Sequence, residues 1–219
     1  MMEMFENLKK LISLDLSKFN TSKVNDMYAM FKDCKSLIEL DLNYFDTSNV
    51  VDMSSMLDHT KNILSIKINN FNTKNVKDMS KMFYYSVNLN NLDISNFDTS
   101  KVTDMSFMFY DCMVLKSLNL SNFNTINVEK LNDMFNFCVK LENIDISNFD
   151  TSNVEYMQGM FNVCSALTSL ILTNFNTKNV KDISDMFKGC SNLKKLDLTK
   201  FDTSKVIKFN SMFSSCTSL

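Results

Sequence analysis

The side chains of this sequence best suited to metal binding or nucleophilic chemistry belong to six cysteines and one histidine. The cysteines share one phase of a repeat, and Thr60 and Ser86 take their place in two units. A straight row of thiols does not surround an ion tetrahedrally, and a disulfide needs Cα atoms about 5.5 Å apart. We therefore predict buried, reduced thiols that pack as small hydrophobic groups. The cysteines are Cys34, Cys112, Cys138, Cys164, Cys190 and Cys216.

The single histidine gives no sign of acid–base catalysis. His59 lies between Asp58 and Thr60, just after an apolar stripe, and no serine or cysteine is placed to use it as a base. We predict that it is a surface or turn residue. The two glycines cannot form a glycine-rich phosphate loop. The sequence therefore predicts a protein that is not an enzyme, with no catalytic residue, no bound metal and no cofactor.

Charge and hydropathy narrow the classes of partner. The formal net charge is -2, and all 23 basic residues are lysines. Nucleic-acid surfaces need a basic stripe and favour arginine, so we predict no nucleic-acid partner. No apolar run approaches the roughly 18 residues of a membrane span, and the N-terminus lacks the features of a signal peptide. Lysine in place of arginine, with abundant asparagine and isoleucine, indicates a low-GC genome.

A repeat of 26 residues runs through the chain without an insertion, and a little over eight units fit into 219 residues. Its anchor is a phenylalanine, at Phe19, Phe45, Phe71, Phe97, Phe123, Phe149, Phe175 and Phe201. A threonine follows two residues later, at Thr21, Thr47, Thr73, Thr99, Thr125, Thr151, Thr177 and Thr203. A methionine also recurs once in each unit, at Met4, Met30, Met56, Met82, Met108, Met134, Met160, Met186 and Met212. Such a period is the signature of a solenoid.

Each unit divides into a segment with strand character and a segment with helix character. Residues 11–17 end in the apolar/polar alternation of a short, half-buried strand. The second segment spaces apolar residues as on one face of a helix, at Val24, Met27, Met30, Phe31 and Cys34. Thr21 and Ser22 fit a helix N-cap or a turn, and Asp26 fits the first helical turn. The methionine row shares this phase, so we predict that it is core.

These elements predict an α/β repeat solenoid, a single domain over residues 1–219. It would have one parallel β-sheet of short strands and a row of short helices, in about eight 26-residue rungs. The segment Asn91–Cys112, NLDISNFDTSKVTDMSFMFYDC, resembles the 26-residue bacterial surface-protein repeat of the BspA-like leucine-rich-repeat family. The resemblance covers essentially the whole chain. It implies a leucine-rich-repeat solenoid with roles in surface adhesion and host–microbe interaction.

The outward side of the predicted strands is the remaining candidate for a binding surface. It carries charged and polar residues but neither aromatic residues nor arginine, the usual binding hot spots. It is either a weak, multivalent binding surface or simply a solvated one. The candidate binding residues are Asp15, Glu39, Asp41, Lys67, Asp93, Asn119, Asp145, Lys195 and Asp197.

The family resemblance implies a cell-surface or extracellular recognition module that adheres to host proteins or glycans. The alternative is a cytoplasmic scaffold for protein–protein interactions, since the chain shows no signal peptide. Neither end of the chain carries a polar capping unit, which solenoids generally need for solubility. We therefore expect flanking sequence, another protein or end-to-end self-association to cover at least one end. No direct insertion into a membrane is expected.

Overall fold

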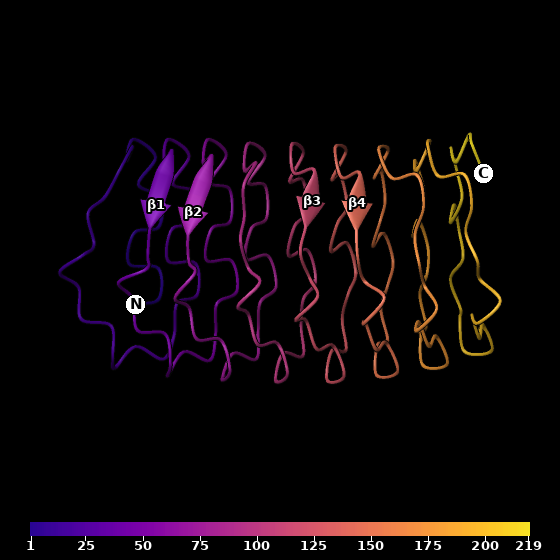
Figure 1. Ribbon diagram of the computed structural model, residues 1–219, viewed down its shortest axis with the longest axis horizontal. Coiled ribbons are helices and arrows are strands. Elements are labelled where there is room, and N and C mark those ends of the chain that lie inside the picture. The colour runs from indigo at the N-terminus through magenta and orange to yellow at the C-terminus, as the bar shows by residue number, and fades with distance from the viewer.

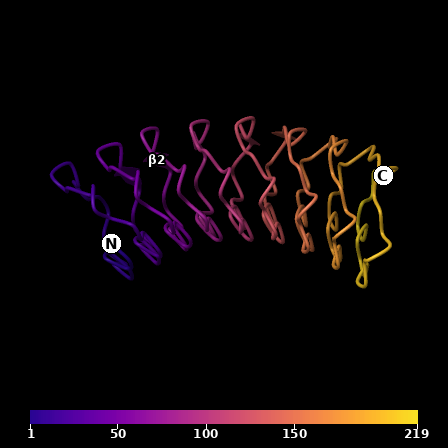
Figure 2. The same ribbon diagram turned by 90° about the horizontal axis from the view of Figure 1, so that it is seen from below.

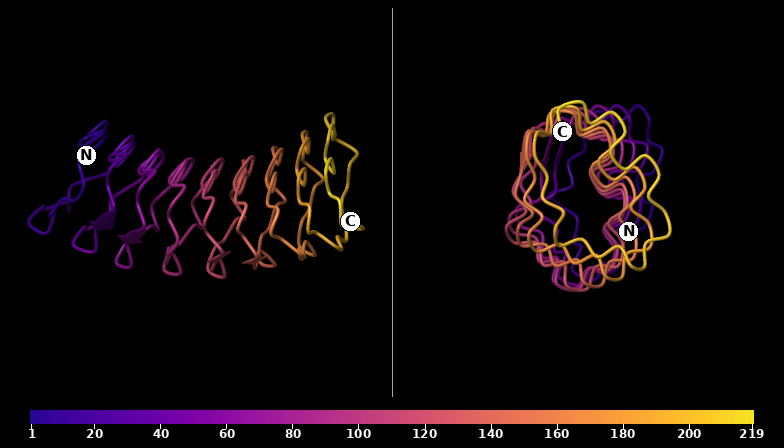
Figure 3. Two further views of the ribbon diagram at one scale, coloured as in Figure 1. Left: turned by 90° about the horizontal axis from the view of Figure 1, so that it is seen from above. Right: turned by 90° about the vertical axis from the view of Figure 1, so that its right-hand side faces the viewer.

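The structure is a computed structural model that describes residues 1–219 as a single row of stacked rungs (Figure 1). The two termini lie at opposite ends of the row, and the row bends gently (Figure 2). Seen end-on, successive rungs follow nearly the same closed outline (Figure 3, right). Residues one repeat apart therefore lie side by side, as the period predicts.

One side of the rungs carries short parallel strands. Strand β1 (Glu39–Asp41) pairs with β2 (Ser65–Lys67), and β3 (Ser117–Leu118) pairs with β4 (Asn143–Ile144). Leu40 is buried while its neighbours in β1 are exposed or half-exposed, which is the alternation expected of a half-buried strand. The strands form two separate two-stranded sheets where one parallel sheet was predicted, and single parallel bridges from Ser65 to Asn91 and from Ser169 to Lys195 extend the pairing.

A second parallel ladder, which the sequence did not suggest, runs along another side of the rungs. Backbone hydrogen bonds join neighbouring rungs there, as from Met53 N–H to Asp78 O (3.1 Å) and from Lys77 N–H to Val51 O (2.8 Å). This ladder is more continuous than the strand pairs. Its single-residue bridges link Asp26, Asp52, Asp78, Asp104, Lys130, Tyr156, Asp182 and Lys208 in order. Asp26 thus belongs to this ladder and not to the first turn of a helix.

The predicted row of short helices is wrong, because the structure contains no helix. In its place each rung forms a chain of tight turns. Met30 N–H donates to Met27 O (3.3 Å), and Cys34 N–H donates to Phe31 O (3.1 Å). Intervening N–H groups donate to the next rung, as from Ala29 to Ser54 O (3.0 Å). We call this stacked arrangement the turn stack.

The spacing between rungs explains why the segment with helix-like apolar spacing forms turns. Parallel strands lie about 4.8 Å apart, whereas an α-helix with its side chains is about 10 Å across. A helix in every rung would force the row apart on that side. Two residues per rung take the left-handed conformation, such as Ala29 (φ 49°) and Asp33 (φ 59°), which is incompatible with a helix. The apolar spacing still turns the same residues inward.

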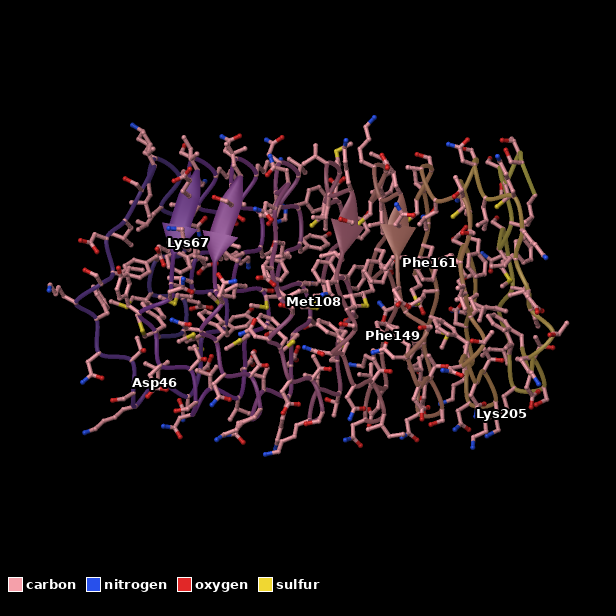
Figure 4. The ribbon with its side chains drawn as sticks, viewed as in Figure 1. Asp46, Lys67, Met108, Phe149, Phe161 and Lys205 are labelled. Atoms are coloured by element: carbon pink, nitrogen blue, oxygen red, sulfur yellow. The ribbon has the colours of Figure 1, made fainter.

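The interior is a continuous apolar core that runs along the row. Met27, Met30 and Phe31 are fully buried, and Met108 lies inside the rungs in Figure 4. The methionine row is therefore core, as predicted, apart from exposed Met4 in the first rung. Ring centroids of successive phenylalanines lie 5.5–5.9 Å apart along the stack of Phe83, Phe109, Phe135, Phe161, Phe187 and Phe213. All but the last, exposed Phe213, are buried.

Seven of the eight repeated threonines, all except exposed Thr203, are buried and join neighbouring rungs, so the predicted N-cap role is wrong. Thr99 is fully buried. Its Oγ1 donates to Asn124 O (2.9 Å) and accepts Asn124 N–H (2.8 Å) in the next rung. Thr73 makes the same pair of bonds with Asp98. Thr21 also begins a turn, because Val24 N–H donates to its carbonyl oxygen (2.8 Å).

Candidate functional site

The nine predicted binding residues lie at the surface, on the outward side of the strands. Eight are exposed and Asp41 is half-exposed. Two shallow hollows form there. One, of about 310 Å³, is lined by Asp15, Glu39, Asp41 and Lys67, and the other, of about 450 Å³, by Asn119 and Asp145 among others. Asp197 borders a separate small hollow of about 200 Å³, and Asp93 and Lys195 line none of these three.

The carboxylates of this strand face also shape the backbone, a role that sequence reasoning missed. Asp41 Oδ1 accepts the N–H of Asn43 (3.1 Å), and Asn119 Oδ1 accepts the N–H of Ser121 (3.1 Å). The spacing of an Asp or Asn two residues before the chain turns could have indicated such bonds. Hydrogen bonds from the residue two positions on lower the pKa of these aspartates. The hydroxyl group contributes most at Asp93 and Asp145, and the backbone N–H contributes most at Asp15, Asp41 and Asp197.

Side chains from neighbouring rungs form an ion pair and a hydrogen bond with two aspartates of the strand face. Lys67 Nζ lies 3.1 Å from Asp41 Oδ2, and Asn69 Nδ2 donates to Asp93 Oδ2 (2.8 Å). Both pairs are exposed, so solvent competes for them. The face therefore presents many separate polar groups and no single charged anchor.

The largest hollow lies elsewhere, beside the second ladder. It has a volume of about 760 Å³ and no apolar lining residue, with Lys77 and Lys101 toward one end and Glu129 and Glu155 toward the other. A row of asparagines borders it, and Asn127 Nδ2 donates to Ser100 O (2.7 Å) of the preceding rung. The recurrence of asparagine just before the repeated valine was a sequence signal for this row.

An aromatic cluster covers part of the turn stack and was not predicted. The rings of His59 and Tyr85 stack with centroids 4.7 Å apart, and Tyr84 lies 5.0 Å from Tyr110. Phe137 extends the cluster, 5.9 Å from Tyr110. Burial raises the pKa of Tyr84 to about 12. These residues come from consecutive rungs, so only the register brings them together.

The structure confirms the prediction that His59 is a surface or turn residue. It has a left-handed backbone (φ 59°), is half-exposed, and bonds through Nδ1 to the carboxylate of Asp58. Burial raises the pKa of Asp58, although the bond to His59 opposes the shift. Thr60 and Ser86 bond to one another (2.9 Å) in the slot that cysteines fill in other rungs.

All six cysteines are free thiols, and five are buried, as predicted. Each donates to a phenylalanine carbonyl of the preceding rung, as from Cys138 Sγ to Phe109 O (3.1 Å). Ser86 Oγ makes the comparable bond, to Leu57 O of the preceding rung (3.3 Å), so the slot requires a small donor and not sulfur. Burial raises the pKa of Cys138 and of Cys190 to about 12. Neither thiol is therefore activated as a nucleophile.

Two further properties concern metal binding and the crossing of a membrane. No group of three or more His, Cys, Asp or Glu side chains converges on a common point suited to a metal ion. No helix in the structure has the length and apolar character needed to cross a membrane.

Comparison with solved structures finds similar chains of low sequence identity. The crystal structure of the TLR13–ssRNA13 complex matches at 20% identity and TM-score 0.33 over 84% of this chain. The Leptospira interrogans LRR protein LIC12759 (15%, 0.36) and a leucine-rich repeat protein from Eubacterium ventriosum (16%, 0.43) each match over 93%. This chain spans 27%, 61% and 80% of those three chains, respectively. The likeness is too low to support an inference about function.

Comparison of the sequence with known proteins gives a family. No curated protein matches the chain significantly. The model of one family, DUF285, described as "Mycoplasma protein of unknown function", matches residues 1–85, 60–171 and 136–219 and so covers the whole chain. This match agrees with the predicted relationship to BspA-like leucine-rich-repeat proteins. The chain therefore belongs to the DUF285 family.

Proposed function

We propose that this chain is a non-catalytic recognition module whose strand face holds a protein or glycan ligand through many weak polar contacts. The observation that supports this most directly is the strand face itself. It repeats exposed carboxylates, amides and amines at one phase of successive rungs, above two shallow hollows. Solenoids commonly bind over such extended surfaces, and repetition supplies avidity where no single contact is strong.

A substitution set can test this face without disturbing its turns. Asn119 forms the same backbone bond as the aspartates, so Asp41→Asn, Asp93→Asn, Asp145→Asn and Asp197→Asn together remove four charges and keep the turns. We expect this variant to lose binding to immobilised host matrix proteins or glycans that the unchanged chain binds. Glu129→Gln with Glu155→Gln, in the hollow beside the second ladder, is the control.

The outcome of that assay locates the binding surface. Loss with the strand-face variant alone supports the proposal. Loss with the control alone would move the site to the second ladder. Loss only after Tyr85→Ala would move it to the aromatic cluster, and either of these results would overturn the strand-face assignment.

We further propose that the module acts at the bacterial surface, as the family resemblance implies. An intracellular interaction scaffold is the second candidate, favoured by six unpaired cysteines, because disulfides persist mainly in oxidising compartments. Intact cells can be treated with a membrane-impermeant amine reagent. Labelling of the 23 lysines is expected for a surface protein. Labelling only after lysis would favour the scaffold and overturn the surface assignment.

A further inference from the structure

The turn stack carries two columns of side chains, three residues apart within each rung. The two side chains of a pair contact one another where both are long enough. Lys81 Nζ lies 5.8 Å from the ring centroid of Tyr84, and the rings of Phe107 and Tyr110 lie 5.9 Å apart. The next three pairs along the row are Asp133 with Asn136, Gly159 with Asn162, and Asp185 with Lys188.

Gly159 leaves a notch in the first column, between Asp133 and Asp185. A Cβ atom at Gly159 would overlap Asp133 Oδ1 and lie 3.2 Å from Asp133 Cγ. The carboxylate of Asp133 therefore leans into the space that a side chain would fill. The backbone does not by itself demand glycine, because Ala29 (φ 49°) and Ser55 (φ 55°) adopt the same left-handed conformation in other rungs. The position of Asp133 therefore explains why a residue without a side chain, Gly159 (φ 62°), occurs here.

Four buried side-chain oxygens without a hydrogen-bond donor belong to this part of the turn stack, on Asn136, Gln158, Asn162 and Asp185. Asn136 is only 5% exposed, and its Oδ1 has no partner. Its Nδ2 donates to Asp133 Oδ1 (2.7 Å) and would lie 3.4 Å from a Cβ at Gly159, so the amide borders the notch. Gln158 Oε1 and Asn162 Oδ1 are also buried without a partner. Each such acceptor destabilises the folded chain unless a donor or a cation satisfies it.

The charge around the notch is negative on balance. Burial raises the pKa of Asp133, and the nearby carboxylates of Asp185 and Asp182 raise it further. Lys188 Nζ lies 3.2 Å from Asp185 Oδ1, yet that oxygen makes no hydrogen bond. Two carboxylates therefore share this region with neutral amides and one lysine.

We propose that the notch at Gly159 binds a hard divalent cation, Ca²⁺, through the side-chain oxygens of Asp133, Asn136, Gln158, Asn162 and Asp185. Ca²⁺ takes six to eight oxygen ligands from carboxylates, amide carbonyls and water in flexible geometry. Zn²⁺ prefers nitrogen and sulfur, and Mg²⁺ demands a near-ideal octahedron. This inference goes beyond the ligand-binding role of the strand face and departs from the prediction that the chain binds no metal.

The solenoid holds these ligands in place before the ion arrives. Asp133 N–H donates to Gln158 O (2.9 Å), and Gly159 N–H donates to Ser184 O (2.9 Å), so three adjacent rungs are fixed in register. With two carboxylates and several neutral ligands, the site resembles extracellular Ca²⁺ modules in charge count. We expect a dissociation constant on the order of 10⁻⁴–10⁻³ M.

Calorimetric titration of the full chain with CaCl₂ tests the proposal. Asp133→Asn should weaken binding at least about tenfold, because carboxylate count tunes Ca²⁺ affinity over orders of magnitude. Lys188→Met should tighten binding, because it removes the competing ammonium group. Asp98→Asn is the matched control, because Asn already occupies this position in the neighbouring rungs at Asn72 and Asn124. Should Asp133→Asn fail to fold by circular dichroism, Asp185→Asn takes its place.

Terbium emission supplies a second readout. The chain has no tryptophan, and Tyr110 lies close enough to Asp133 for the carboxylate to raise the pKa of the phenol. Tb³⁺ in the notch should therefore emit on tyrosine excitation, and Ca²⁺ should quench that emission by displacement. No heat up to about 10 mM Ca²⁺, tenfold above the weakest expected constant, would overturn the proposal. Equal weakening by Asp98→Asn and Asp133→Asn would also overturn it.

Discussion

Replacing Thr99 by valine tests whether the buried threonine row holds the rungs together. Valine keeps the shape of the side chain but has no hydroxyl group. The substitution removes the bond to Asn124 O (2.9 Å) and the bond from Asn124 N–H (2.8 Å). Neither backbone group of Asn124 has another backbone partner. Loss of this one hydroxyl group thus leaves the N–H and the C=O of Asn124 unpaired, beside the fully buried side chain at position 99.

The expected loss of stability follows from those two groups. A buried polar group left without a partner costs about 1–3 kcal/mol, so two cost about 2–6 kcal/mol of the free energy of unfolding. For a chain of this size that corresponds to a fall in Tm of roughly 4–24 °C. Thr99→Ser keeps the hydroxyl and loses one methyl group, which costs about 1 kcal/mol. An N-cap threonine would lose about 1 kcal/mol on change to valine and little on change to serine, which caps a helix at least as well.

Urea unfolding followed by circular dichroism, with thermal melts alongside, measures these differences. Thr103→Val is the control, because Thr103 is exposed and makes only one long bond, to Lys77 O (3.3 Å). We expect the order Thr99→Val, then Thr99→Ser, then Thr103→Val, from most to least destabilising. If Thr99→Val is no more destabilising than Thr99→Ser, the hydroxyl bridge does not stabilise the stack and the reasoning fails.

Two further predictions concern buried acids and thiols. Burial, and then the like charges of Asp104 and Asp52, raise the pKa of Asp78, so its ionisation costs stability once the pH exceeds the unfolded-state pKa. Asp78→Asn should therefore raise Tm at pH 7 but not at pH 3, where the acid is already neutral, and a lower Tm at pH 7 would refute this. Burial also raises the pKa of Cys138 and Cys190 to about 12. In the folded protein a thiol reagent at pH 8 should react with half-buried Cys216 before the other five, and all six should react in denaturant.

The regularity of the repeat made much of the architecture predictable. A fixed period without insertions places equivalent residues side by side, so the stacking of Phe83 on Phe109 follows from the period alone. The buried face was equally readable, because burial depends on which side chains are apolar at one phase. Met27 and Cys34 are buried for this reason, whether their segment is helical or not. The outward position of Glu39 and Lys67 follows from strand alternation.

The candidate sites were less predictable, because they depend on contacts between rungs. The aspartates of the strand face were predicted only as exposed candidate binding residues, yet Asp41 also bonds to a backbone N–H and to Lys67. The notch at Gly159 requires Asp133, which lies 26 residues away in sequence and directly adjacent in space. In the sequence, glycine occurs at this position only at Gly159, and Asp133 shares its residue type only with Asp185. The chemistry of that difference becomes visible only when the rungs are stacked.

The sequence by itself determined the period, the register, the composition of the core and the residues on the surface, since these follow from local pattern and repetition. The tertiary structure decided how the backbone satisfies its hydrogen bonds. A spacing of about 4.8 Å between rungs leaves no room for a helix about 10 Å across, so the segment beginning at Met27 became a turn stack. The same close spacing turned Thr99 from a predicted cap into a bridge between rungs.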